Sequence, residues 1–327
     1  MTDIAVFIGL VLLIVAHELG HFSAAKAFGM YVEEFGIGFP PRLFSRKRGE
    51  TRYSLNLIPL GGFVKLHGEL DNTSARSFMR EKAWKRAIVL VAGVVMNFIA
   101  GSLLFSAVLW MGAPPAVFIS EVVTGSPAEG AGLQQGDIVD GFTDPNVFMA
   151  YVKKHGGERI TLSVTRAGAH KAISIVPRAH PPRGEGALGI ALVGGGAEGV
   201  GGWDGLRGGF VMAYSTAWSV ITGLAAIFYE PQAIVGPVGI FRVASGAGAI
   251  GFAYVIQLLG VISLNLAVLN LLPIPALDGG RLFFIVVEKI RRKQFSPQFE
   301  LRANSIGFAL LIAFVVVVTA KDIIALL

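Results

Sequence analysis

The chain has no cysteine and little charge. Among its 327 residues there is therefore no disulfide framework, no thiolate nucleophile and no cysteine-based zinc site, so any metal must be held by His, Asp or Glu. Only 15% of the residues are charged, against about 25% in soluble domains, while 53% are hydrophobic. This balance excludes a disordered chain and an ordinary cytosolic enzyme, and it indicates a membrane protein.

Four apolar stretches approach the roughly 20 residues that a helix needs to cross a bilayer. They cover residues 4–28, 88–111, 252–277 and 306–327. A fifth stretch, 210–229, is richer in Gly, Ser and Thr, and can either span the bilayer or lie in its interface. The first stretch is not expected to be a signal peptide, because no positive charge precedes it and no small-residue cleavage site follows it.

Basic residues indicate the orientation, because short loops rich in Lys and Arg stay in the cytoplasm. Twelve lie between residues 26 and 86, and a second group of five lies between 289 and 302. The first helix should therefore run inward and the second outward, which leaves residues 113–207 outside. If 210–229 crossed the bilayer, the third helix would run outward and place the second basic group outside. We therefore expect 210–229 to lie in the interface, so that this group stays in the cytoplasm. The basic charge is thus a topology signal, and nucleic-acid binding is not expected.

The first apolar stretch contains the pattern H-E-x-x-H, formed by His17, Glu18 and His21. Positions i and i+4 share one face of a helix, so both imidazoles can hold one metal ion. Glu18 lies beside them and can take a proton from an attacking water. Polar residues are costly in hydrocarbon and seldom occur there without a partner or a task. The alternative is a set of helix-end residues that face lipid headgroups.

The third apolar stretch supplies the remaining candidates. A catalytic zinc takes three protein ligands, and Asp278 at the end of this inward-running stretch is expected at the depth of the histidines. Pro273 and Pro275 should break the helix near the metal, where irregular backbone lines a cavity. Asn265 and Asn270 are intramembrane amides that either join helices or hydrogen-bond a substrate's backbone or developing oxyanion.

Residues 51–69 have the composition of a β-hairpin. Residues 53–59 and 62–66 are strand-like and flank Leu60-Gly61, which we predict to be the turn. An open strand edge near the metal can accept an extended substrate as an added strand. Gly61, Gly62, Phe63 and Val64 are therefore candidate substrate-binding residues. A cytoplasmic hairpin without a substrate role is the alternative.

A β-rich domain is predicted over residues 113–180, with short strand-like runs at 117–119, 122–123, 138–139, 160–164 and 173–176. Residues 126–137 resemble the S-P-A-x-x-A-G-L-x-x-G-D stretch of PDZ domains, which bind peptides by strand addition. The segment has room for one such domain. It either excludes bulky ectodomains from the metal or docks a partner. Residues 181–209, rich in Gly, are expected to be a linker with little structure.

Taken together, these motifs resemble the site-2 protease family of intramembrane zinc metalloproteases, in its bacterial RseP-like branch with a single PDZ domain. The resemblance includes H-E-x-x-H at 17–21, N-x-x-P-x-P-x-L-D-G at 270–279 and a Gly-Pro segment at 236–240. It implies one Zn²⁺ held by His17, His21 and Asp278, with Glu18 as general base. It also implies substrate contacts by Asn265 and Asn270, and a membrane-reentrant β-loop at the hairpin.

The resemblance further implies a multi-pass protein of the bacterial inner membrane, with its PDZ-like domain outside and its catalytic site toward the cytoplasm. Its substrates would be transmembrane segments of single-pass membrane proteins, cleaved in regulated intramembrane proteolysis. Anti-sigma factors and leftover signal peptides are candidates.

The expected fold is a multi-pass α-helical membrane protein with four transmembrane helices, a membrane-associated β-hairpin and one inserted extracytoplasmic PDZ-like domain. Its parts are two membrane halves with the inserted domain, a linker and an interfacial segment between them: 1–112, 113–180, 181–209, 210–251 and 252–327.

Two other functions stay open. A membrane adaptor with a structural metal would need a fourth ligand, for which His67 is the nearest spare residue. An ion transporter would need polar residues along several helices, whereas 88–111 offers only Asn97, Ser102 and Ser106.

Overall fold

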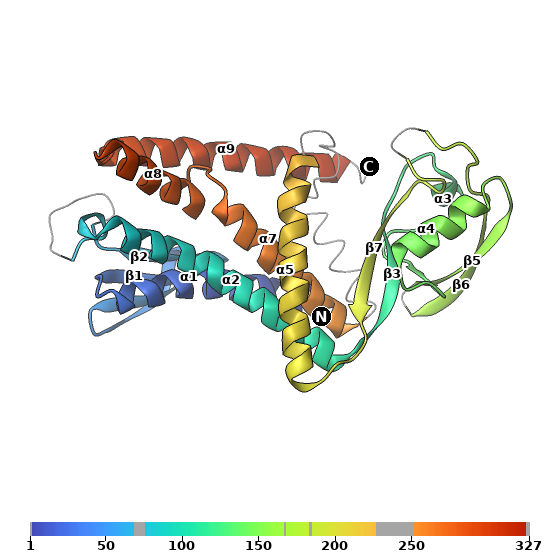
Figure 1. Cartoon of the computed structure of the whole chain (residues 1–327), viewed down its shortest axis with the longest axis horizontal. Helices are drawn as coiled ribbons and strands as arrows, with labels where there is room; N and C mark the ends of the chain where they lie inside the picture. Colours follow the sequence, from blue (N-terminus) through green and yellow to red (C-terminus); the bar gives the residue numbers. More distant parts are fainter. Residues whose placement is uncertain (1, 69–75, 167, 183–184, 227–250, 325–327) are drawn as a thin grey trace. The chain divides into compact units, whose positions relative to one another are not determined.

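The computed structural model describes residues 2–68, 76–166, 168–182, 185–226 and 251–324 (Figure 1). The chain divides into two compact units. One consists mainly of Leu104–Val211 and carries a five-stranded sheet. The other consists mainly of Phe7–Leu103 and Leu259–Leu327, and it carries the H-E-x-x-H pattern of the first apolar stretch together with Asp278.

Within the described residues, four helices are long and apolar enough to cross a membrane. They are α1 (Thr2–Ala27), α2 (Ala83–Met111), α7 (Phe252–Leu271) and α9 (Pro297–Ile324). Only 11% of the most apolar window of α9 is buried, so side chains such as Leu310 and Val317 need lipid around them rather than water. The expectation of four apolar helices able to span a bilayer is confirmed.

The fifth apolar stretch also forms a helix, α5 (Gly202–Ala226), which begins earlier than predicted. It is not among the described helices that are apolar enough to span, and its interfacial position stays a prediction. The predicted Gly-Pro segment at 236–240 lies outside the described residues, as does the rest of 227–250.

The predicted hairpin over 51–69 has a different topology. Its two strands belong to one long strand, β2 (Thr51–Leu66), and both pair with β1 (Val32–Arg48). Ile37 of β1 partners both Leu55 and Gly62, so the first part of β1 lies between the two predicted strands. The chain does reverse direction between the two predicted strands, but they do not pair with each other, so the predicted hairpin closed at Leu60-Gly61 is wrong.

The real turn of this hairpin follows Arg48, where Gly49 adopts a φ of 61° that favours glycine. β1 was not predicted from the sequence, because its second half carries two prolines and four basic residues, which are unusual in a strand. Among the described residues, the segment 62–66 pairs with β1 and with no second strand, so the expected strand edge is present at Gly62, Phe63 and Val64.

The third apolar helix ends at Leu271, because Pro273 and Pro275 cannot continue it. The helical path resumes as α8 (Asp278–Arg291), so Asp278 opens a new helix rather than ending the membrane span. The intervening loop folds against this helix start: a Cβ on Gly280 would meet the Ile274 carbonyl oxygen well inside van der Waals contact. The predicted proline break is confirmed, and its result is to fix the direction of Asp278.

A buried ion pair joins α2 to α8. Arg86 Nη2 donates to Glu288 Oε2 at 2.7 Å, and both side chains are 5% exposed. Glu288 also accepts the Phe295 backbone N–H at 2.9 Å, while Arg86 Nη1 contacts the Met79 sulfur at 3.5 Å. These contacts hold α8, which begins with Asp278, against α2.

Replacing one partner of this pair should be costly. We expect Arg86→Met to destabilise the protein by about 3–5 kcal/mol, because Glu288 would stay buried without its cation. Arg86→Met combined with Glu288→Leu should recover most of that loss. Unfolding in mixed micelles measures both effects. Lys85→Met, which breaks the more exposed pair with Glu81, should cost under about 1 kcal/mol, and equal losses at the two positions would contradict the prediction.

The five-stranded sheet of the other unit has the order β6-β5-β4-β3-β7. Its strands are β3 (Ala113–Val122), β4 (Ile138–Val139), β5 (Ile160–Arg166), β6 (Ala169–Ile175) and β7 (Ile190–Ala197), with helices α3 (Pro127–Gly130) and α4 (Pro145–Lys154) between them. Val117, Leu162 and Phe148 belong to its core. The predicted strand runs are confirmed, and the PDZ assignment stays a prediction.

The prediction of an unstructured linker at 181–209 is wrong. β7 pairs antiparallel with β3 from Ala113↔Ala197 to Val122↔Ile190 and forms an edge of the sheet. Its glycines concealed it, since Gly is depleted in strands. The Val200 N–H donates to the Leu109 carbonyl at 2.8 Å, and the Trp110 indole donates to the Gly202 carbonyl at 3.0 Å. The segments that enter and leave the sheet therefore lie side by side.

Candidate metal centre

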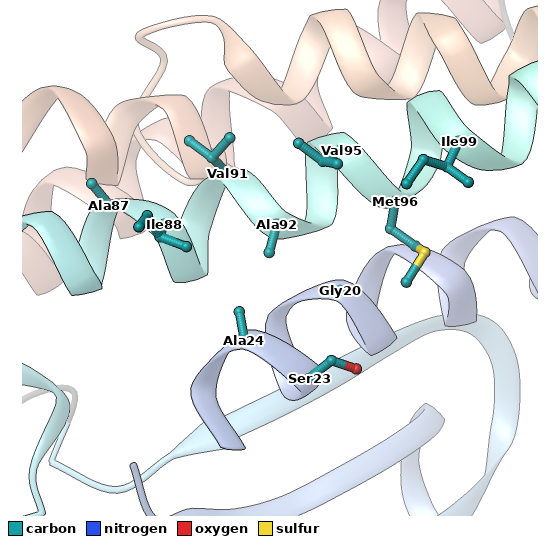
Figure 2. A pocket seen from close by; sticks show the side chains of 10 residues that line it. All are labelled: Gly20, Ser23, Ala24, Ala87, Ile88, Val91, Ala92, Val95, Met96 and Ile99. Atoms are coloured by element: carbon teal, nitrogen blue, oxygen red, sulfur yellow. The ribbon is translucent and has the colours of Figure 1, made fainter. Parts of the chain in front are cut away.

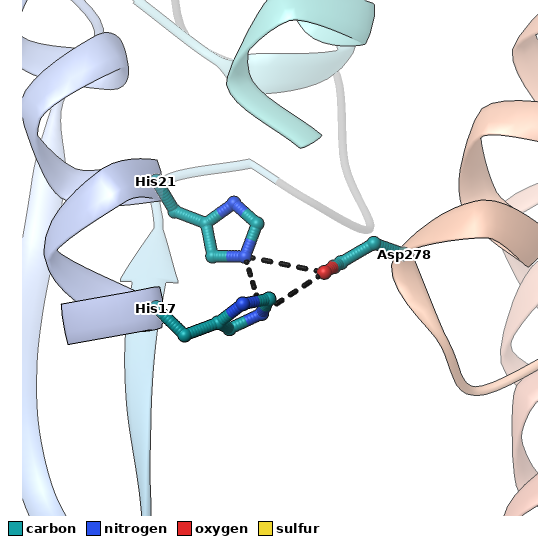
Figure 3. Close-up of side chains that lie close together, drawn as sticks. All are labelled: His17, His21 and Asp278. Carbon is teal, nitrogen blue, oxygen red and sulfur yellow. Dashed lines mark hydrogen bonds and ion pairs between the residues drawn. The ribbon is translucent and has the colours of Figure 1, made fainter. Parts of the chain in front are cut away.

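His17 and His21 project from one face of α1, and Asp278 from the first turn of α8 points toward them (Figure 3). The two imidazole Nε2 atoms are 3.1 Å apart. Asp278 Oδ2 lies 3.1 Å from His17 Nε2 and 3.3 Å from His21 Nε2. Both histidines are buried, each residue being 8% exposed. The structure thus brings together all three predicted metal ligands, although 257 positions separate His21 from Asp278 along the sequence.

The triangle of donor atoms fits zinc. Zinc–nitrogen and zinc–oxygen bonds of about 2.0–2.1 Å in a tetrahedron separate neighbouring ligand atoms by about 3.3 Å. The three measured separations are 3.1, 3.1 and 3.3 Å, close to that value. Two nitrogens and one carboxylate oxygen are also the donors that zinc takes in catalytic sites with an open fourth position. The three side chains can therefore hold one Zn²⁺.

Glu18 lies on α1 between the two histidines and faces the edge segment of β2. The backbone of Val64 hydrogen-bonds its carboxylate. A Cβ on Gly62 would lie 3.0 Å from Glu18 Cγ, so the backbone of β2 runs directly along this side chain. The predicted base and the predicted strand edge are therefore neighbours.

The two asparagines of α7 differ in position. Asn270 Nδ2 lies 3.4 Å from His17 Nε2, so this amide borders the cluster. Asn265 is half-buried five residues earlier. Among the described residues, the side-chain amide near His17 on α7 is that of Asn270, and Asn265 makes no hydrogen bond to the three candidate ligands. Only one of the two predicted amides is therefore beside the candidate metal centre.

Sequence reasoning missed the contribution of α2 to the site. The His21 Nδ1–H donates to the Val89 carbonyl at 2.8 Å, and Asn97 Nδ2 lies 3.3 Å from His17 Nδ1. Every residue has a backbone carbonyl, so the sequence does not show which carbonyl accepts a hydrogen bond. Asn97 stands out as a rare polar residue in an apolar run, but its partner cannot be identified from one sequence.

His67, the spare residue for a structural metal, belongs to a separate cluster. Its Nδ1 pairs with Glu33 Oε1 at 2.7 Å, and Lys65 Nζ approaches the other carboxylate oxygen of Glu33 at 2.7 Å. These hydrogen bonds, first that from Lys65, lower the pKa of Glu33 against a smaller opposing effect of burial. Among the described residues, the metal-binding cluster consists of His17, His21 and Asp278. A four-ligand structural site is thus not supported there.

An apolar cavity of about 480 Å³ lies between α1 and α2 (Figure 2). Small residues such as Gly20, Ala24 and Ala92 line it. A Cβ on Gly20 would overlap the Ala92 carbonyl, so this glycine permits close approach of the two helices. None of the candidate metal ligands lines this cavity, which is therefore distinct from the metal centre.

Comparisons with known proteins agree with this geometry. The profile of peptidase family M50 matches residues 5–314. A Clostridium perfringens protein named "Putative zinc metalloprotease" is 34% identical over 330 residues, covering 95% of each chain. Zinc metalloprotease RasP of Shouchella clausii is 31% identical over 412 aligned positions, covering 95% of this chain and 96% of its own. Zinc metalloprotease RasP of Geobacillus kaustophilus is 28% identical, covering 95% of each chain.

The family match extends over nearly the whole chain and includes both helices that carry the candidate ligands. The relatives named as zinc metalloproteases cover almost their full lengths, so the likeness is not confined to one motif. With four apolar helices able to span a bilayer, the chain is a bacterial membrane protein. It belongs to peptidase family M50, the site-2 proteases, and is a zinc-dependent metalloprotease.

Proposed function

We propose that this protease hydrolyses peptide bonds inside the membrane-spanning segments of single-pass membrane proteins. His17, His21 and Asp278 hold the catalytic zinc, and Glu18 is the general base. The observation that carries the proposal is the triangle of Nε2, Nε2 and Oδ2 atoms, with sides of 3.1, 3.1 and 3.3 Å, in which both nitrogens come from α1, a helix long and apolar enough to cross a membrane. Donors on such a helix are within reach of a substrate segment that is itself in the membrane.

Zinc at this site supplies Lewis-acid activation of a water molecule and of the scissile carbonyl. The Glu18 carboxylate takes the proton of the attacking water as the carbon–oxygen bond forms. It then returns this proton to the leaving nitrogen as the carbon–nitrogen bond breaks, so the proton balance closes on one residue. The Asn270 amide, 3.4 Å from His17 Nε2, can donate a hydrogen bond to the developing oxyanion.

The edge of β2 binds the substrate backbone in this proposal. A transmembrane helix hides its peptide groups, so the target must unwind before attack. An extended segment added beside Gly62, Phe63 and Val64 gains main-chain hydrogen bonds that replace part of those lost on unwinding. Buried Gly61 contributes to the shape of the strand: its φ is 145° and a Cβ there would overlap the Phe39 ring. Asn265 is assigned to more distant substrate contacts along α7.

Charge supports a location in the bacterial cytoplasmic membrane with the zinc toward the cytoplasmic half. Basic residues flank α1, α2 and α8, whose connecting segments then lie inside. The β-rich domain lies outside, where it screens substrates by the size of their ectodomains or contacts peptides. Leftover signal peptides, and anti-sigma factors whose ectodomain has already been trimmed, would pass such a screen.

Substrate unwinding gives a test of this function. Two glycines placed in the transmembrane segment of a single-pass reporter should speed cleavage roughly tenfold or more, since each lowers the cost of unwinding by about 1 kcal/mol. Rates in proteoliposomes and mass spectrometry of the fragments measure the effect and the cut position. The same glycines placed outside the membrane segment serve as the control. Cuts confined to the reporter's soluble part would refute the proposal.

A further inference from the structure

One face of α2 lies against both imidazoles of the metal centre. Val89, Gly93 and Asn97 are spaced by four residues, so they lie on the same side of this helix. The Val89 carbonyl accepts the His21 Nδ1–H at 2.8 Å. A Cβ on Gly93 would overlap the rings of His21 and His17, so the helix backbone touches both. Asn97 completes the series opposite His17 Nδ1.

The chemistry of His17 requires an acceptor at this point. Its Nε2 faces Asp278 and His21, so Nε2 is the atom directed to the cation. A neutral imidazole that ligates through Nε2 carries its proton on Nδ1, which is then a hydrogen-bond donor. The polar side-chain group adjacent to Nδ1 is the Asn97 amide at 3.3 Å, and Asn97 is 1% exposed. Water therefore has little room to replace it.

The Asn97 amide offers that acceptor. Its Nδ2 is the atom now nearest to Nδ1, while Oδ1 is buried and, in the part of the chain that the structure describes, has no hydrogen-bond partner. A half-turn of the terminal amide exchanges the two atoms and gives Oδ1 the Nδ1–H as a donor. In that orientation the amide supports the tautomer with the proton on Nδ1, which leaves Nε2 free for the ion. A buried apolar side chain would serve neither.

We infer that Asn97 is a positioning residue for zinc: its side-chain carbonyl accepts the His17 Nδ1–H, fixes the ligating tautomer and keeps Nε2 directed at the ion. Val89 performs the same task for His21 through its backbone. The Ser263 hydroxyl donates to the Asn97 backbone carbonyl at 2.8 Å, which joins this point of α2 to α7. The inference rests on the proposed role of His17 as a ligand. Outer partners of this kind orient the ring and raise its basicity.

Zinc affinity, measured by competition with a chelator on the purified full-length protein, tests this role. Asn97→Leu has nearly the same shape but no acceptor, and we expect zinc to bind about 10–100-fold more weakly. Asn97→Asp keeps an oxygen at the same place and should return the affinity to the wild-type range. Ser102→Ala is the matched control, because Ser102 is also buried on α2 and its hydroxyl donates to Phe98 in its own helix. Its affinity should be unchanged.

A second readout is the visible spectrum of the cobalt-substituted protein, which reports ligand geometry independently of cleavage. Asn97→Leu should alter the spectrum and Asn97→Asp should retain it. Unchanged zinc affinity in Asn97→Leu, or an equal loss in Asn97→Leu and Asn97→Asp, would overturn the inference, since the first excludes the contact and the second indicates packing alone. Failure of the wild-type protein to bind zinc through His17 would instead overturn the proposed function on which it rests.

Discussion

Glu18→Gln is expected to abolish measurable peptide-bond cleavage while zinc stays bound. Gln has the shape of Glu and its carbonyl can still accept the hydrogen bond from the Val64 backbone, but it cannot take a proton. General-base catalysis contributes about 10²–10⁴-fold, so the initial rate on a single-pass reporter should fall by that factor. The three candidate ligands are untouched, so the zinc content per protein should equal that of the wild type.

The matched control for this variant is Glu81→Gln. It makes the same chemical change at a carboxylate that pairs with Lys85 at 2.8 Å, away from the metal centre. It should retain both cleavage and zinc. Normal cleavage by Glu18→Gln would end the assignment of Glu18 as the base. Loss of zinc in that variant would show that Glu18 belongs to the ligand set.

Asp278→Ala is expected to lose zinc and, with it, all activity. The change leaves two imidazoles on α1, too few to hold a catalytic zinc. The loss of affinity should exceed the 10–100-fold that is typical of an outer hydrogen-bonding partner. Chelator competition measures it, and unfolding in micelles shows whether α8 keeps its place. Because Arg86 and Glu288 fasten α8 separately, the fold should survive the substitution.

Asp204→Ala is the control for the loss of one carboxylate. Asp204 lies exposed in the first turn of α5. Its replacement should leave zinc affinity and cleavage at wild-type values. Retention of tight zinc by Asp278→Ala would remove the carboxylate from the ligand set and require another donor.

The convergence of the three candidate ligands could be predicted from sequence because simple rules apply to each of them. The i,i+4 spacing places His17 and His21 on one helix face whatever surrounds them. The charge pattern predicts that α1 and α7 run in the same direction, which would bring Asp278 to the depth of the histidines. The sequence did not reveal that Asp278 begins α8, because a proline break indicates where a helix stops but not where the next one starts.

The β segments were harder to predict because strand pairing is non-local. Residues 53–59 and 62–66 look like strands, but their common partner Val32–Ile37 is added from outside the predicted hairpin. β7 was not predicted because it contains three consecutive glycines, which do not favour a strand. Its backbone pairing with β3 stabilises it as a strand despite this composition. The contact between Asn97 and His17 depends on the packing of two helices, which one sequence does not specify.

The pairing of β3 with β7 has a consequence for how the chain can vary. Ala113 and Ala197 are partners, so the polypeptide leaves α2 and returns toward α5 through adjacent points. The residues between those two points form an inserted domain whose two ends lie next to each other. The alignment with the Shouchella clausii relative is longer than this whole chain, so that relative carries residues that this one lacks. Because the two ends of the inserted domain stay paired, its length can change without a change in the spacing between the end of α2 and the start of α5.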